Sequence, residues 1–133
     1  MTATKTPTNF TELGLIPPLL ARLSELEYQQ PTPIQAQAIP EVLAGHDLIA
    51  GANTGSGKTA TFALPLLQQI STIQNEQKSS NIRAKGNFVT ALILVPTREL
   101  ATQVADSVKS YAVHFNGAIK TVAVFGGVSV NKQ

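Results

Sequence analysis

The fold follows from the stretch Leu48-Ile-Ala-Gly-Ala-Asn-Thr-Gly-Ser-Gly-Lys-Thr59, because it joins a short apolar run to a glycine-rich turn. The apolar residues 48–50 predict a short strand, and the residues after the turn predict a helix from about Gly57 to Gln74. Pro65 is expected to kink this helix, because proline removes a backbone donor and crowds the preceding turn. A strand, a glycine-rich turn and a helix in this order form half of a β-α-β unit.

The glycine-rich turn has the features of a loop that binds the phosphates of a nucleoside triphosphate. Gly55 and Gly57 let the backbone curl so that successive N–H groups point inward, at the positive end of the following helix. Lys58 supplies a cation for the β- and γ-phosphates, and the Thr59 hydroxyl is placed to ligate the bridging Mg²⁺. The strict pattern has glycine where Ala52 stands, but the position between strand and helix favours a phosphate loop over a chance turn. The predicted loop comprises Ala52, Asn53, Thr54, Gly55, Ser56, Gly57, Lys58 and Thr59, with Asn53 and Ser56 permissive.

Two helices are expected before the phosphate loop. Prolines in a first turn and an apolar face predict a helix from about Pro17 to Glu27. A second helix is expected after Thr32, an N-cap residue that is followed by Pro33 and, at the capping-box spacing, by Gln35. Gly45 is expected to end this second helix.

Strands and helices are also expected to alternate after the loop. Residues 74–87 are polar and loop-like, and the continuous apolar run from Val89 to Val95 predicts a strand buried on both faces. Thr97 is placed to cap a third helix, which Asn116-Gly117 stops, and residues 121–125 predict another strand. The sequence therefore predicts an α/β domain with a parallel sheet flanked by helices and right-handed crossovers.

Composition narrows the possible functional classes. Hydrophobic residues are 43% and charged residues 14% of the 133 residues, which is typical of a globular protein with one core. Residues 1–9 are expected to be a flexible polar leader, and residues 10–133 the domain. No apolar stretch approaches the ~20 residues that span a bilayer, and the leader lacks a secretory signal core, which indicates the cytoplasm. There is no cysteine, and His46 and His114 are too far apart in sequence to suggest a metal cage.

A net charge of +2 permits a polyanionic partner without requiring one.

Further motifs surround the phosphate loop. They are Tyr28-Gln-Gln-Pro-Thr-Pro-Ile-Gln35 upstream, and Pro96-Thr-Arg-Glu-Leu-Ala101 and Gly126-Gly127 downstream. Together with Ala52 to Thr59 as motif I, this set resembles the first RecA-like domain of the DEAD-box ATP-dependent RNA helicases, over about Phe10 to Gln133. Within that family, the segment Val124-Phe-Gly-Gly-Val-Ser129 is most similar to the bacterial RhlE type.

The resemblance implies that Gln35 and Phe10 contact the adenine of ATP. A glutamine amide can both donate to and accept from the N7 and N6 edge of adenine. The spacing alone favours a capping box with Thr32, the resemblance favours the adenine contact, and the two roles are compatible in different nucleotide states. Phe10 is expected to stack on the adenine, or alternatively to anchor the leader through simple burial. One departure is Glu27, because the family usually has glycine there, which leaves open the path of the chain into Tyr28.

The resemblance also implies that the RNA backbone is contacted by Pro96, Thr97, Arg98, Gly126 and Gly127. Backbone N–H groups at a helix start and a guanidinium can meet a phosphate, and glycine permits a close approach. Such contacts would be independent of base sequence. From the residues alone, Thr97 could equally be only a cap and Arg98 the partner of Glu99 in a surface ion pair.

The residues that complete ATP hydrolysis are missing. Hydrolysis needs one carboxylate on the metal and another to position water, and the family has both in an Asp-Glu-Ala-Asp segment that does not occur before Gln133. We therefore expect a truncated domain that binds ATP and Mg²⁺ and is inactive alone. One alternative is a nucleotide-binding module that regulates a partner without catalysis. Another P-loop NTPase is also possible, such as a GTPase with a guanine-reading motif beginning at Asn131-Lys132. Ala52 and the upstream segment that ends at Gln35, the Q motif of the family, both oppose it.

Overall fold

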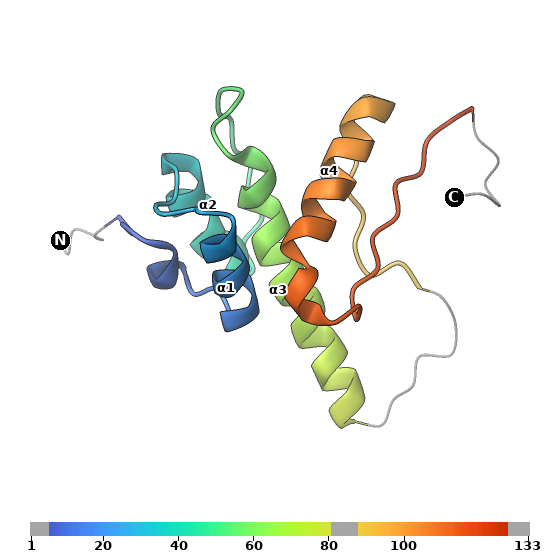
Figure 1. The fold of residues 1–133 in the computed structure, drawn as a ribbon, viewed down its shortest axis with the longest axis horizontal. Helices are drawn as coiled ribbons and strands as arrows, with labels where there is room; N and C mark the ends of the chain where they lie inside the picture. The colour runs from blue at the N-terminus through green and yellow to red at the C-terminus, as the bar shows by residue number, and fades with distance from the viewer. Residues whose placement is uncertain (1–5, 81–87, 128–133) are drawn as a thin grey trace.

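The computed structural model describes residues 6–80 and 88–127, which form a layer of helices with extended segments along one side. The order of elements is η1 (Phe10–Leu13), α1 (Pro17–Glu25), α2 (Pro33–Leu43), α3 (Lys58–Ser79), α4 (Arg98–Tyr111) and η2 (Val113–Phe115). The long helix α3 contacts α2 on one side and α4 on the other, while α1 contacts α4 and η2. Figure 1 shows α3 crossing the middle of the molecule between the N-terminal helices and α4.

Polar side chains begin three of these elements. The Oδ1 of Asn9 accepts from the amide of Glu12 at 3.1 Å, which places the start of the helical chain at Phe10 as predicted. Thr32 and Gln35 form the predicted capping box at the start of α2. The Oγ1 of Thr97 accepts from the amide of Leu100 at 3.2 Å, which confirms the predicted cap of α4.

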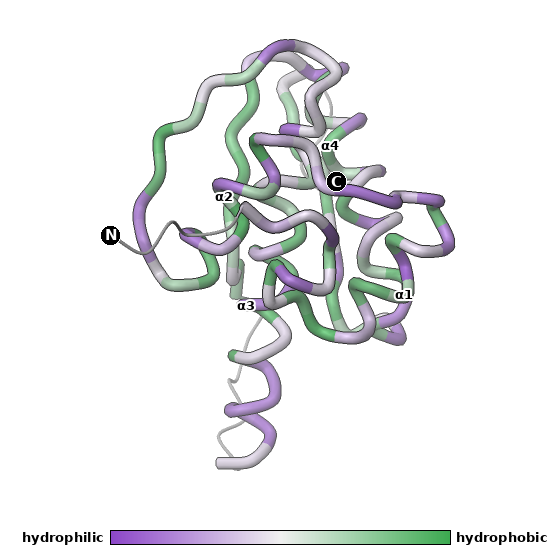
Figure 2. The backbone as a smooth tube through the Cα atoms, turned by 90° about the vertical axis from the view of Figure 1, so that its left-hand side faces the viewer, coloured by the Kyte–Doolittle hydropathy of each residue, from purple (hydrophilic) through white to green (hydrophobic). Residues whose placement is uncertain are grey.

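Three helix ends differ from the prediction. Helix α4 ends at Tyr111 rather than at Asn116-Gly117, because the amide of Ala112 donates to the carbonyls of both Val108 and Lys109 and the chain tightens into the 3₁₀ turn η2. Helix α1 ends at Glu25 rather than Glu27, because Glu27 has a φ of 59°, in the left-handed region that side chains disfavour. Helix α3 runs through Pro65 and continues to Ser79, so the loop expected from Gln74 is wrong as far as Ser79. Residues 74–78 contain glutamine, glutamate and lysine and no breaker, and these are good helix formers. Figure 2 shows these last turns as a hydrophilic projection from the rest of the molecule.

The core lies between the helices. Its completely buried side chains include Leu19 and Leu23 of α1, Ile39 of α2, and Leu64 and Leu67 of α3. Helix α4 adds Val104, Val108 and Tyr111, which recur at three- and four-residue spacing. Because α3 contributes to the same cluster as its neighbours on both sides, the start of α3 is held at a fixed place in the fold.

The three predicted strands are not formed within the described ranges. Residues 48–50, 89–95 and 121–125 are irregular chain without strand pairing, so the parallel sheet expected from the sequence is not confirmed. Exposure alternates along the last two segments: Ile93 and Val95 pack on the core, whereas Leu94 is 84% and Val124 65% exposed. The expected burial of 89–95 on both faces is therefore wrong, because α3 and α4 cover one face only.

Candidate functional site

The predicted phosphate loop lies at the N-terminal end of α3. Gly55 has a φ of 82° and Gly57, the N-cap of the helix, a φ of 80°, so both occupy the left-handed region that glycine permits. The amide of Ser56 donates to the carbonyl of Asn53 at 3.2 Å and closes a turn within the loop. No side chain caps α3, which leaves the first amides of the helix available to an anion, with the helix dipole in their favour.

Three polar side chains of the loop fit a phosphate and its metal. The Nζ of Lys58 donates to the carbonyl of Ala52 at 2.6 Å, so the side chain reaches across the loop. Its ammonium can donate to a phosphate oxygen instead of this carbonyl when an anion binds. The Oγ of Ser56 is buried without a hydrogen-bond partner, and the half-buried Thr59 follows Lys58 on the first turn of α3. A hydroxyl without a partner beside uncapped amides is consistent with an anion site.

Gln35 joins the start of α2 to the phosphate loop. Its side chain is 3% exposed; Oε1 accepts from the amide of Thr32 at 3.0 Å, and Nε2 donates to the carbonyl of Gly57 at 3.2 Å. A Cβ on Gly57 would lie 2.3 Å from that Nε2, so only glycine fits. The capping box is thus confirmed, and contact between Gln35 and adenine stays a prediction. Sequence reasoning missed the bond to Gly57, because no local pattern relates two residues 22 positions apart.

The aromatic side chains of the N-terminal region form a row. Phe10 is 5% exposed within the core, and its ring centroid lies 6.2 Å from that of Tyr28. This burial fits the anchoring role better than an open stacking surface, although adenine stacking by Phe10 stays a prediction. Tyr28 is 40% exposed, and its ring meets that of Tyr111 edge-on at 6.4 Å. Burial, and then the hydrogen bond to the Tyr28 hydroxyl, raise the pKa of Tyr111 above its usual range.

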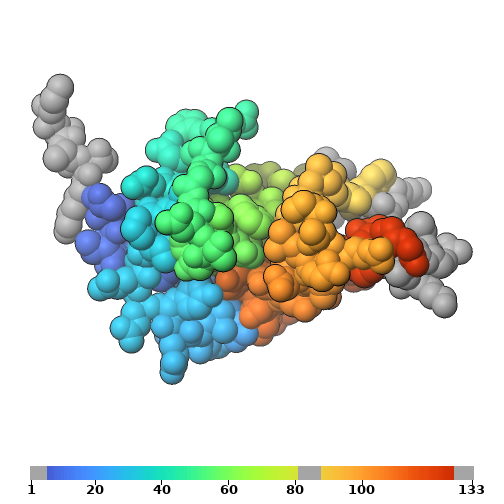
Figure 3. Space-filling model, turned by 90° about the horizontal axis from the view of Figure 1, so that it is seen from above, coloured from blue at the N-terminus to red at the C-terminus, as the bar shows by residue number. Residues whose placement is uncertain are grey.

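The residues predicted to contact RNA surround the start of α4. The side chain of Arg98 lies against Gly127, where an added Cβ would be 3.3 Å from Nη1, and Gly127 has a φ of 83°. In Figure 3 the orange atoms of α4 and the red atoms before the grey C-terminal end lie side by side. A hollow of about 760 Å³ between the extended segments and the helices is lined by many apolar residues and by Pro96, Thr97, Arg98 and Gly126. The structure therefore brings the five predicted residues together.

Neither an ion pair of Arg98 nor a metal cluster is found within the described ranges. Arg98 and Glu99 are not among the ion pairs of residues 6–80 and 88–127. Those same residues contain no group of three His, Cys, Asp or Glu side chains that could hold a metal ion.

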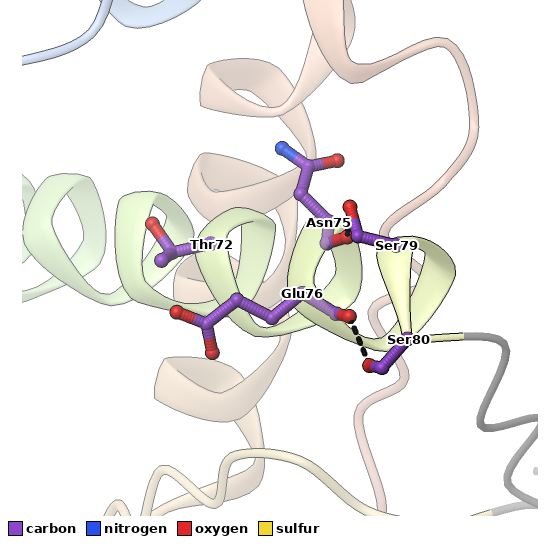
Figure 4. Close-up of a pocket in the computed structure, with 5 residues that line it drawn as sticks. All are labelled: Thr72, Asn75, Glu76, Ser79 and Ser80. Carbon is purple, nitrogen blue, oxygen red and sulfur yellow. Dashed lines mark hydrogen bonds between the residues drawn. The ribbon is translucent and has the colours of Figure 1, made fainter.

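A separate pocket on α3 offers no chemistry of this kind. Figure 4 shows its lining, Thr72, Asn75, Glu76, Ser79 and Ser80, all from the C-terminal turns of one helix. The hydroxyls of Ser79 and Ser80 donate to carbonyls of the preceding turn, so these two hydroxyls are satisfied within the helix. None of the helices in the described part of the chain could span a membrane.

Comparison with known proteins agrees with the motifs. The model of the DEAD/DEAH box helicase family matches residues 32–133. "ATP-dependent RNA helicase DeaD" of Escherichia coli (strain K12) is 45% identical over 126 residues, which are 95% of this chain and 18% of that protein. "ATP-dependent rRNA helicase RRP3" of Lodderomyces elongisporus is 42% identical over 125 residues, which are 94% of this chain and 22% of that protein.

Solved structures show the same likeness. The RNA helicase Prp28 from Chaetomium thermophilum bound to ADP superposes with a TM-score of 0.77 at 41% identity, over 94% of this chain and 28% of that one. A DEAD box protein from the hyperthermophile Methanococcus jannaschii gives a TM-score of 0.70 at 35% identity, over 95% and 31%. The chain thus spans less than a third of the length of each protein compared here.

Proposed function

Since this chain belongs to the DEAD/DEAH box helicase family, we propose that it is the nucleotide-binding part of an ATP-dependent RNA helicase. The observation that supports this most is the uncapped start of α3, where two left-handed glycines, Lys58 and the Gln35–Gly57 bond are combined. ATP hydrolysis and RNA unwinding are proposed for the whole protein, because the relatives named for these activities are several times longer.

The proposed fold is a RecA-like P-loop domain with a parallel sheet, of which this chain contains the first part. The alternating exposure of residues 89–95 and 119–125 is typical of strands with one face on a helical layer. The likeness to helicase structures at TM-scores of 0.77 and 0.70 supports the same assignment. We expect residues 48–50, 89–95 and 121–125 to pair as parallel strands in the whole protein.

ATP with Mg²⁺ is the proposed ligand of residues 52–59. Bound Mg²⁺ would neutralise phosphate charge and polarise the γ-phosphate. Lys58 would exchange its bond to the Ala52 carbonyl for the β- and γ-phosphates, and the Thr59 hydroxyl would face the metal. Gln35 and Phe10 would confer the preference for adenine; the ADP present in the Prp28 structure agrees with an adenine nucleotide as the ligand.

RNA is the proposed partner of the surface formed by Pro96, Thr97, Arg98, Gly126 and Gly127. The guanidinium of Arg98 beside Gly127 offers charge and close approach, which suit a phosphate rather than a base edge. Binding is therefore expected to be independent of base sequence. The RhlE subtype and a cytoplasmic location remain predictions from the sequence. So does the flexible leader at residues 1–9, of which residues 1–5 lie outside the described residues.

Competitive titration with MgATP, MgADP and MgGTP tests the proposed nucleotide function. The wild-type chain should prefer the adenine nucleotides, and Gln35→Ala should lose roughly 1 to 3 kcal/mol of that preference. Gln69→Ala is a matched control, because the Gln69 amide donates to the Val42 carbonyl at 3.0 Å, away from the loop. Equal affinity of the folded wild-type chain for MgATP and MgGTP would contradict the proposal and favour a GTPase.

A further inference from the structure

The two ends of α4 meet two different parts of the proposed helicase site. Its N-terminal end begins at Thr97 and Arg98, which the proposed function assigns to RNA. Its C-terminal end meets α1 and the segment that precedes the capping box of α2. At 1.5 Å per residue, the helix from Arg98 to Tyr111 measures about 21 Å. A change at one end of this helix can therefore alter the other end.

Four polar contacts fasten the C-terminal end of α4 and the adjoining η2. The Nε of Arg22 donates to the carbonyl of Ser110 at 2.7 Å, and its Nη2 to the Ser110 Oγ at 3.0 Å. The Nε2 of His114 lies 2.7 Å from Oε1 of Glu25, and the hydroxyls of Tyr28 and Tyr111 are hydrogen-bonded at 3.2 Å. We call this set the α1–α4 clasp; its residues are Arg22, Glu25, Tyr28, Ser110, Tyr111 and His114.

The geometry of the clasp makes it more specific than hydrophobic packing. The carbonyl of Ser110 belongs to the last turn of α4, where carbonyls have no partner within the helix and the dipole attracts a cation. Arg22 meets both this carbonyl and the Ser110 hydroxyl, so its guanidinium fixes direction as well as distance. Tyr111 is almost fully buried, whereas Tyr28 is partly exposed. The hydrogen bond between their hydroxyls therefore connects the buried C-terminal end of α4 to an aromatic ring at the surface.

Tyr28 also lies at the base-binding end of the proposed nucleotide site. Its ring contacts Phe10, and four residues after it Thr32 begins the capping box with Gln35. A ligand that contacts Phe10 or Gln35 therefore acts on the neighbours of Tyr28. Helix α4 has no proline or glycine between Arg98 and Tyr111 that would allow a kink, so a displacement of Tyr111 is expected to move the helix as one unit.

We propose that Tyr111 is a positioning residue that couples the base-binding end of the nucleotide site to the start of α4. When a nucleotide base displaces Tyr28, the hydrogen bond between the two hydroxyls displaces Tyr111 as well. Helix α4 then transmits this displacement to Thr97 and Arg98. The inference rests on the proposed function, because it takes the ligand at Phe10 and Gln35 to be a nucleotide. It assigns to Tyr28, Tyr111 and Arg22 a role in communication between the two binding surfaces.

The test follows backbone amides of the ¹⁵N-labelled chain by NMR at saturating MgADP, so that differences in affinity do not enter. The reporters are the amides of Leu100, bonded to the Thr97 Oγ1, and of Ala101, bonded to the Thr97 carbonyl. MgADP should shift both signals in the wild type. In Tyr111→Phe, which keeps the ring and removes the hydroxyl, the shift at saturation should fall at least twofold. Ser107→Ala is the matched control, because the hydroxyl of Ser107 on the same helix lies outside the clasp.

Tyr28→Phe provides an independent check, since it removes the same bond from the exposed ring and does not disturb the buried one. It should reduce the Leu100 shift as Tyr111→Phe does, and the double variant should show no further loss. An undiminished shift in either variant overturns the inference, as does a wild type that binds MgADP without any change at Leu100. A folded wild type that binds no MgADP overturns the proposed nucleotide function itself, which separates the two failures.

Discussion

Gly57→Ala is expected to destabilise the fold through Gln35. The new Cβ would lie 2.3 Å from Nε2 and 3.2 Å from Cδ of Gln35, and 3.5 Å from Cγ2 of Thr32. The Gln35 side chain is buried and cannot keep its position beside the new Cβ. Its hydrogen bond to the Gly57 carbonyl is therefore lost, and the capping box with Thr32 is disturbed. Each lost bond costs about 0.5 to 1.5 kcal/mol, and the left-handed φ of 80° costs an alanine about 1 to 2 kcal/mol.

The total loss, about 2 to 5 kcal/mol, is large against the roughly 5 to 15 kcal/mol that stabilise a typical domain. Urea unfolding followed by circular dichroism measures it. The matched control is Gly45→Ala, because Gly45 has a φ of 86° and an added Cβ meets nothing within 4 Å. Gly45→Ala should lose only the backbone part, about 1 to 2 kcal/mol. Equal losses in the two variants would refute the role given to Gln35.

A double variant separates the steric clash from the backbone strain. In Gln35→Ala/Gly57→Ala the amide that opposes the new Cβ is gone, so the combined loss should be smaller than the sum of the two single losses. Additive losses would show that Gln35 and Gly57 act independently. The expected coupling is on the order of 1 kcal/mol, within the usual range for residues in direct contact.

Three further predictions concern separate parts of the chain. Glu27→Gly should stabilise the fold by up to about 1 kcal/mol in urea unfolding, because Glu27 has a left-handed φ of 59°; a loss of stability would contradict this. The hydrogen bond from Arg22, and then that from His114, lower the pKa of Glu25, so its contribution to stability is present above the unfolded pKa and is lost as pH falls through the folded one. Wild-type stability should therefore fall on acidification below about pH 4.5 more than that of Glu25→Gln, and parallel pH curves would refute it. Arg98→Ala should weaken binding of unrelated single-stranded RNAs alike and lower the log-log salt slope by less than about one unit; altered preference among those RNAs with an unchanged slope would mean that Arg98 contacts bases.

Local patterns predicted the features that depend on neighbours in sequence. The caps at Thr32 and Thr97 formed as expected, because a cap needs only a side-chain oxygen and an amide within three residues. The left-handed Gly55 and Gly57 follow from the freedom of glycine. The stop expected at Asn116-Gly117 marks the end of η2 at Phe115, whereas α4 itself ends earlier, at Tyr111. These features were sufficient to place the predicted phosphate loop at the start of a helix.

Contacts between distant residues could not be predicted in this way. The bonds from Gln35 to Gly57 and from Arg22 to Ser110 join residues 22 and 88 positions apart, and they exist only because the helices pack as they do. The apolar run 89–95 has the composition of a strand buried on both faces, but burial depends on a second layer that lies outside the run itself. The sequence indicated which residues of this run are apolar, and the packing of the helices determined which face of the run is covered.

We propose that residues 52–59 at the start of α3 bind the phosphates of an adenine nucleotide through the Lys58 ammonium. Isothermal titration of MgATP into the wild type, Lys58→Ala and the control Lys109→Ala, an exposed lysine of α4, tests it most directly. A charge-assisted hydrogen bond contributes about 1.5 to 3 kcal/mol, so Lys58→Ala should weaken binding roughly 10- to 100-fold while Lys109→Ala binds as the wild type does. MgATP binding of equal strength in Lys58→Ala and the wild type would contradict the claim.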